Sequence, residues 1–173
     1  MGTRARSLFS FPNPVNEVAA RVVAGVVVLL CVLAVALDER WLLVVIAYGF
    51  WARALTGPTL SPLGQLATRV VAPRLPGEPR LVPGPPKRFA QAIGVAFSTS
   101  ALVLWYGFGL GTATWVVTAM LGAAALLEAA FGLCLGCLAF GALMRAGLIP
   151  EEVCVACADI SLRHPQLSPT HPR

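Results

Sequence analysis

The stretch VVAGVVVLLCVLAVAL, residues 22–37, contains no charged residue and is nearly as long as a helix that crosses a lipid bilayer. Together with the residues before it, it predicts a first membrane span over about 14–37. In this span Asn13 caps the helix and Pro14 takes its first position. The basic arm and the apolar run also fit a secretory signal peptide, for which Ala34-Val35-Ala36 would be the cleavage site.

Three more apolar segments follow, and they predict spans at about 41–55, 89–111 and 113–144. Hydrophobic residues make up 57% of the 173-residue chain and charged residues only 12%. A soluble globule of this size could not bury so much apolar surface, so that class is excluded. The sequence therefore predicts an all-α protein, a four-span integral membrane helical bundle that forms one domain over residues 1–160.

Basic residues are concentrated next to the apolar segments and predict the orientation in the membrane. Residues 53–88 contain six basic residues and one acidic residue, and the N-terminal arm is also rich in Arg. Because positively charged loops stay on the cytoplasmic side, we expect both segments, and with four spans both termini, to be cytoplasmic. This pattern indicates a multi-pass protein of the cell's inner (plasma) membrane that contacts the lipid bilayer and binds no nucleic acid.

The segments outside the spans have patterns of their own. Residues 61–72 begin with Ser61-Pro62 and place apolar residues at helical spacing, which predicts a cytoplasmic amphipathic helix at the membrane surface or a helix packed on the bundle. The prolines of 73–88 predict a stiff extended linker. A short cytoplasmic helix is expected over 150–160 and a disordered tail over 161–173.

Cysteine provides the strongest chemical signal. The chain has five cysteines, and four of them form two CxxC pairs, Cys134 with Cys137 and Cys154 with Cys157. The spacing of these pairs fits a tetrahedral zinc site with four thiolate ligands. It also fits dithiol–disulfide exchange, in which a second thiol resolves a mixed disulfide. The remaining residue, Cys31, has no partner in the sequence and is interpreted as a packing residue.

The position of the first pair in its helix decides what its thiols can do. An unbroken helix to Met144 would place Cys134 and Cys137 near the negative C-terminal end, which disfavours a thiolate. A break within 131–136 would start a new helix near Cys134 and reverse that conclusion. Gly132 and Gly136 form a GxxxG pair, so close helix packing, and with it a homo-oligomer, is the alternative interpretation.

Glu128 lies inside the fourth apolar segment, where an ionisable side chain is a functional candidate. It could accept a proton from the thiols. On an unbroken helix, however, it would face away from Cys134 and Cys137. The structural interpretation is an ion pair with Arg21, and Arg53 is the alternative partner.

Four patches of the sequence resemble a bacterial membrane family catalogued as domain of unknown function 4395, and its actinobacterial form in particular. The resemblance covers about residues 9–160. Members look like four-span membrane proteins, and their genes are often neighbours of thioredoxin-like or rhodanese-like sulfurtransferase genes. This resemblance implies a role in thiol redox or sulfur transfer and draws attention to Cys134 and Cys137. The patches are Phe11–Asn16, Thr56–Pro62, Pro85–Gln91 and Gly132–Cys137.

Three hypotheses follow for function. The first is a thiol relay or sulfur-trafficking protein that works with a soluble thioredoxin-fold or sulfurtransferase partner; its catalytic thiols are Cys134, Cys137, Cys154 and Cys157. The second is a non-enzymatic membrane module in which the same four cysteines bind a structural zinc ion. The third is a small permease for a sulfur compound.

Overall fold

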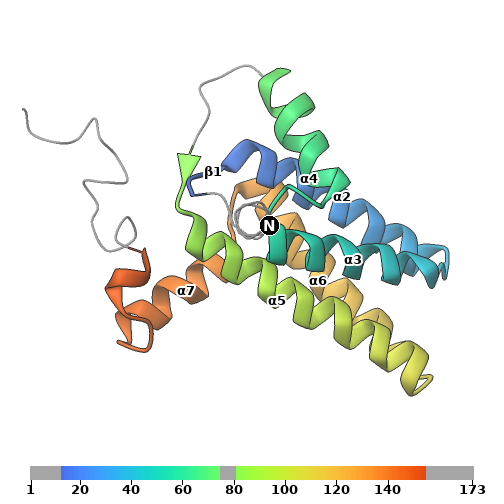
Figure 1. Cartoon of the computed structure of the whole chain (residues 1–173). Helices are drawn as coiled ribbons and strands as arrows, with labels where there is room; N and C mark the ends of the chain where they lie inside the picture. Colours follow the sequence, from blue (N-terminus) through green and yellow to red (C-terminus); the bar gives the residue numbers. More distant parts are fainter. Residues whose placement is uncertain (1–12, 75–80, 155–173) are drawn as a thin grey trace, which may run out of the picture.

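The computed structural model describes residues 13–74 and 81–154 and is all-α apart from one short ribbon. Four helices lie side by side: α2 (Glu17–Ala36), α3 (Trp41–Thr56), α5 (Gly84–Leu102) and α6 (Gly111–Phe131) (Figure 1). Within the described residues, three helical stretches are long and apolar enough to cross a membrane: Glu17–Ala36, Gly84–Gly107 and Gly111–Phe131. This confirms the membrane-helix character and the all-α class, and α3 is a shorter apolar helix.

Apolar side chains of all four helices form the core. Val27 and Cys31 of α2 pack with Phe50 of α3 and Leu121 of α6, and α5 adds partly buried residues. The expectation that Cys31 is a packing residue is therefore confirmed. Many large apolar side chains instead point outward from the bundle, as a lipid-facing surface requires. Examples are Leu29, Val32, Val44, Val45, Val116 and Met120.

The start of α2 differs from the prediction. The N-cap is Asn16, whose side chain accepts hydrogen bonds from the backbone N–H groups of Val18 and Ala19. Asn13 instead accepts a hydrogen bond from the backbone of Gly84, at the first turn of α5. The prediction that Asn13 and Pro14 begin the helix was wrong because residues 15–16 form strand β1 (Val15–Asn16), which pairs with β2 (Leu81–Val82).

The segment after α3 is helical, as predicted. It consists of α4 (Pro62–Leu66), a π-helical turn η1 (Ala67–Val71) and a 3-10 turn η2 (Ala72–Arg74). Ser61 caps it by accepting a hydrogen bond from Gly64 N. Ala67 is fully buried against Ala19 and Val23 of α2, so the apolar face of this segment packs against the bundle.

Helix α5 begins within the segment that was expected to be an extended linker. Its first turn contains Pro85 and Pro86, which suit the start of a helix because no partner for their missing N–H is needed there. The helix continues through a π-helical turn, η3 (Val103–Gly107), and α6 begins at Gly111. The predicted span of 89–111 thus covers most of this helix, but it misses the first turn, which contains Lys87, and it runs past Gly107 to the first residue of α6.

Candidate functional site: a dithiol at the start of α7

The fourth apolar segment is broken, so the prediction of one span over 113–144 was wrong. Helix α6 ends at Phe131, and Gly132 follows in the left-handed conformation with a φ of 69°. The N–H groups of Gly132 and Leu133 donate to the carbonyls of Glu128 and Leu127, which closes the end of α6 in a Schellman motif. Helix α7 (Leu135–Arg145) then begins, and it leaves the bundle at an angle (Figure 1).

This break places the first CxxC pair at the start of a helix. Cys134 is the N-cap of α7 and has extended backbone angles, and Cys137 lies within the first turn. Both are free thiols; Cys134 is 7% exposed and Cys137 is half-buried. The positive end of a helix stabilises a thiolate. Of the two alternatives that the sequence left open, the break within 131–136 is therefore confirmed.

Close packing against α5 holds the start of α7 in place. A Cβ atom added to Gly136 would lie 2.5 Å from both Cα and Cβ of Ala90, so only glycine permits this approach. One helical repeat further on, the Phe140 ring meets the Phe89 ring edge-on at 5.6 Å between centroids. Gly132 lies outside α7, so the two glycines share no helix face and do not form a GxxxG dimerisation surface.

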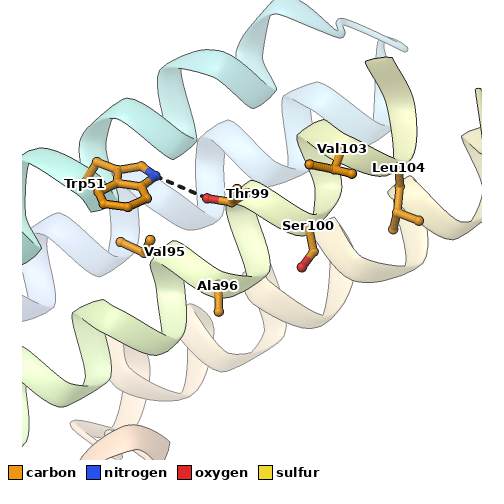
Figure 2. A pocket seen from close by; sticks show the side chains of 7 residues that line it. All are labelled: Trp51, Val95, Ala96, Thr99, Ser100, Val103 and Leu104. Atoms are coloured by element: carbon orange, nitrogen blue, oxygen red, sulfur yellow. Dashed lines mark hydrogen bonds between the residues drawn. The ribbon is translucent and has the colours of Figure 1, made fainter. Parts of the chain in front are cut away.

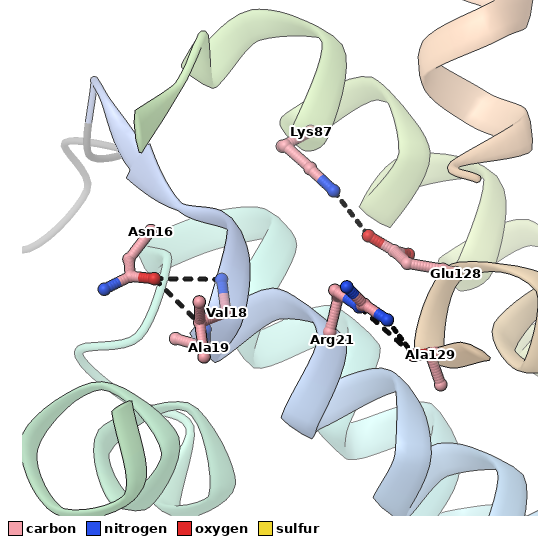
Figure 3. A network of polar contacts seen from close by, with 7 residues as sticks. All are labelled: Asn16, Val18, Ala19, Arg21, Lys87, Glu128 and Ala129. Carbon is pink, nitrogen blue, oxygen red and sulfur yellow. Dashed lines mark hydrogen bonds and ion pairs between the residues drawn. The ribbon is translucent and has the colours of Figure 1, made fainter. Parts of the chain in front are cut away.

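Lys87 brings a positive charge to the dithiol. Its Nζ atom lies 2.5 Å from Oε1 of Glu128, and the two side chains are only 10% and 18% exposed (Figure 3). The charges of Lys87 and Glu128 both reach Cys134 and Cys137 and act on their ionisation in opposite directions. Lys87 was not among the predicted site residues, because residues 73–88 were expected to form a linker. The signal was a lone Lys directly after the two prolines that begin a helix.

Neither expected partner of Glu128 forms an ion pair with it in the described structure. Arg21 donates from Nε and Nη2 to the carbonyl of Ala129, at 3.2 and 3.1 Å, and from Nη2 to the carbonyl of Ala130 at 2.8 Å (Figure 3). It thereby satisfies the last carbonyls of α6, which have no partner within the helix. Arg53 donates to Oε1 of Gln91 and lies over the Phe50 ring. The predicted pairing of Glu128 with Arg21 was wrong, and Lys87 takes that place.

The two thiols of the pair ionise differently. Hydrogen bonding from Cys137 is the main effect that lowers the pKa of Cys134, and Lys87 adds to it, while burial and Glu128 oppose it. The pKa of Cys137 is raised, first by its hydrogen bond to Cys134 and then by burial. Of the two thiols, Cys134 is therefore the one that ionises more readily.

The second CxxC pair is described only in part. Cys154 is buried at the end of the 3-10 turn η4 (Glu151–Cys154), which contacts α5, and it is disulfide-bonded. Cys157 lies outside the described residues, as do most of the expected helix over 150–160 and the tail over 161–173. In the part of the chain that the structure describes, no three His, Cys, Asp or Glu side chains lie close enough together to hold a metal ion. Cys134, Cys137 and Cys154 therefore do not gather into a zinc site there.

A groove of about 640 Å³ lies on the other side of α5, away from the thiols. Trp51 of α3 borders it and donates a hydrogen bond from Nε1 to Oγ1 of Thr99 at 3.1 Å (Figure 2). Its remaining lining is apolar or small. It contains no group that could take part in thiol chemistry, so the dithiol is the stronger candidate site.

Comparison with known proteins gives one match. The sequence model of the family described as Domain of unknown function (DUF4395) matches residues 15–145. This range contains all four bundle helices, the dithiol and α7. No curated protein and no solved structure matches the chain.

Proposed function

The chain belongs to the DUF4395 family, and from this premise we propose that it is a membrane dithiol protein. In this proposal Cys134 and Cys137 exchange electrons or sulfur with a soluble thioredoxin-like or rhodanese-like partner. One observation carries the proposal: a CxxC pair of free thiols begins a helix, with Cys134 as the N-cap and the charge of Lys87 beside it. These are the features that make a cysteine reactive.

The proposed topology has four spans, formed by α2, α3, α5 with η3, and α6. Helix α3, with 16 residues, is about 24 Å long at 1.5 Å per residue, so it would cross a locally thin region of the bilayer. The starts of α2 and α5 and the ends of α3 and α6 share one end of the bundle with the dithiol. The basic loop over 57–83 belongs to that end, so the positive-inside rule assigns the dithiol and both termini to the cytoplasmic face of the plasma membrane.

Aromatic side chains at the opposite end support this topology. The rings of Trp105 and Trp115 lie 5.6 Å apart, and the guanidinium of Arg40 lies 4.5 Å from the Trp105 ring centroid. The hydroxyl of Tyr106 donates to the backbone carbonyl of Arg40. Such amphipathic rings favour the interface between lipid and water, and here they would mark the outer surface.

Exchange at this site would begin at Cys137. Cys137 is half-buried and Cys134 is only 7% exposed, so a protein partner reaches Cys137 first. A mixed disulfide between Cys137 and the partner is then resolved by Cys134, which is close to it and inaccessible to competing thiols. Glu128 is the candidate acceptor for a thiol proton, and its ion pair with Lys87 competes with that role.

The second pair has a related part in the proposal. Cys154 and Cys157 would form a further dithiol on the same side of the membrane, which passes electrons or sulfur between the soluble partner and the first pair. The contact of η4 with α5 supports this part, because it keeps the segment that ends at Cys154 beside the helix that carries Lys87.

Trapping of the mixed disulfide tests the proposal. The probe is a thioredoxin variant whose single active-site cysteine is activated as a mixed disulfide with thionitrobenzoate. The parent chain for this test has Ser in place of Cys31, Cys154 and Cys157. When Cys134→Ser is added, we expect the protein to form a lasting adduct at Cys137. The matched variant Cys137→Ser should form much less adduct because Cys134 is buried. The proposal fails if neither variant reacts faster than a chain that keeps only the buried Cys31.

A further inference from the structure

Lys87 lies near the start of α7 because α5 packs against that helix. Ala90, three residues after Lys87 in α5, lies so close to Gly136 that a Cβ atom added to Gly136 would be 2.5 Å from it. Glu128, the ion-pair partner of Lys87, lies six residues before Cys134. Both charges of the ion pair act on both thiols.

Other charged side chains lie at the same end of the bundle. Arg21 is held on the last carbonyls of α6, Arg53 donates to Gln91, and Arg88, next to Lys87, is exposed. A carboxylate oxygen of Glu17 would lie 3.1 Å from a Cβ atom added at Gly132, two residues before Cys134. Among the described cations, Lys87 is the one whose charge acts on both thiols, so it is the cation best placed to favour the thiolate.

We propose that Lys87 is a positioning residue that stabilises the Cys134 thiolate and thereby makes the Cys134–Cys137 disulfide a better electron acceptor. This inference rests on the proposed dithiol function and adds the direction in which electrons flow. A dithiol whose reduced form is stabilised has a more oxidising disulfide, because reduction gains the energy of the stabilised thiolate. Electrons would then flow from a partner dithiol into the membrane protein.

The accessibility of the two sulfurs fits this direction. A thiolate of the partner dithiol attacks the sulfur of the half-buried residue Cys137, the Cys134–Cys137 disulfide bond breaks, and Cys134 leaves as the stabilised thiolate. The second partner thiolate then attacks the partner's own sulfur in the mixed disulfide, and Cys137 leaves and takes up a proton. The partner has lost two electrons and both thiol protons. One proton is now on Cys137 and the other has passed to solvent.

Glu128 opposes Lys87 and raises the pKa of Cys134 by more than Lys87 lowers it, which gives an ordered set of expectations. Loss of Lys87 alone leaves the Glu128 carboxylate beside the thiols, and loss of Glu128 alone leaves the Lys87 ammonium. The double variant Lys87→Met/Glu128→Gln has neither charge and no unpaired buried ion. A purely structural role of the ion pair would predict that both single variants behave alike and that the double variant recovers.

The experiment is redox equilibration of the full-length chain, carrying Ser at Cys31, Cys154 and Cys157, with mixtures of reduced and oxidised glutathione. We expect Lys87→Met to make the disulfide about tenfold harder to reduce, a potential lower by ~30 mV. Glu128→Gln should shift the equilibrium in the opposite direction, the double variant should lie between the two, and Lys87→Arg should stay near the parent. Arg40→Met, at the far end of the bundle, is the control.

The pH dependence of Cys134 alkylation provides a second readout that does not require a disulfide. Its midpoint should rise in Lys87→Met and fall in Glu128→Gln. The inference is overturned if the four variants share one glutathione equilibrium and one alkylation midpoint, or if both single variants shift in the same direction. If the parent chain forms no Cys134–Cys137 disulfide at all, the proposed function itself fails.

Discussion

Lys87 at the start of α5 and Glu128 at the end of α6 form an ion pair, with 2.5 Å between Nζ and Oε1, beside the cysteines that begin α7. The pair joins α5 to α6, and its two residues are 41 positions apart in the sequence. It also relates the two charges to one redox site, since each acts on both thiols. Removing only one partner of a buried ion pair is destabilising, because the other charge is left without a partner. The double variant, which removes both charges, is therefore the informative one.

The hydrogen bond between the two thiols predicts a difference between two substitutions of Cys137. Because Cys137 holds the pKa of Cys134 below its usual value by donating to its sulfur, Cys137→Ala should raise that pKa. Cys137→Ser retains a hydroxyl donor and should raise it less. The measurement is the alkylation rate of Cys134 against pH in chains that lack the other three cysteines. The more alkaline midpoint is expected for the Ala variant, and equal midpoints would contradict the prediction.

Gly136 predicts a matched pair of substitutions in one helix. Gly136→Ala places a methyl group 2.5 Å from the Ala90 backbone, so α7 must move away from α5 at a cost of about 1–3 kcal/mol in the free energy of unfolding. Gly141, also in α7, has no atom within 4 Å of an added Cβ, and Gly141→Ala should be neutral or stabilising. Thermal unfolding in mild detergent compares them, and equal melting temperatures would argue against the close contact.

How much of the fold could be predicted from the sequence depends on whether a feature is set by neighbouring residues or by contacts between distant ones. Apolar runs predicted the bundle helices because a membrane span needs little beyond length and hydropathy. Ser61 correctly predicted a helix start, since capping is a local property. Asn13, by contrast, does not cap α2. Its side chain accepts a hydrogen bond from the N–H of Gly84 in α5, because the β1–β2 pairing brings the two residues together. That pairing connects residues far apart in the sequence and leaves no local pattern.

The candidate site could be predicted only in part, because some of its contacts join residues that are far apart in the sequence. The CxxC motif identified Cys134 and Cys137, and Gly132 marked where the helix could break. These local signals do not show that Lys87 rather than Arg21 pairs with Glu128, because the pairing depends on how α5 and α6 pack. Arg21 found other acceptors in the carbonyls of Ala129 and Ala130 that the end of α6 exposes.

The role of Arg21 predicts a loss of stability without a loss of charge pairing. Arg21→Met removes the donors to the last carbonyls of α6 and should lower the free energy of unfolding by about 1–3 kcal/mol. Arg88→Met, which changes an exposed side chain on α5, is the control. Thermal unfolding of both in the same detergent provides the comparison. A control that melts as early as Arg21→Met would show that the loss of a positive charge, and not of the cap, is responsible.

Gly94 predicts how closely α3 and α5 approach. A Cβ atom at this position would lie 2.1 Å from the nearest atom of the Phe50 ring, so Gly94→Ala forces the ring out of the core. We expect a cost of about 1–3 kcal/mol in the free energy of unfolding. Gly25→Ala, in α2 with nothing within 4 Å, should not destabilise. The prediction fails if chemical denaturation gives the two variants the same midpoint.

The most direct test of the central claim, that Cys134 and Cys137 form a working dithiol, is the reversible formation of one disulfide between them. The chain with Ser at Cys31, Cys154 and Cys157 is purified without oxygen, treated with a mild oxidant and then with a reductant, and its free thiols are identified by alkylation and mass spectrometry. The account predicts that both thiols disappear together, in a peptide lighter by two hydrogens, and that both return on reduction. Two thiols that stay alkylatable after oxidation in the folded protein would contradict it.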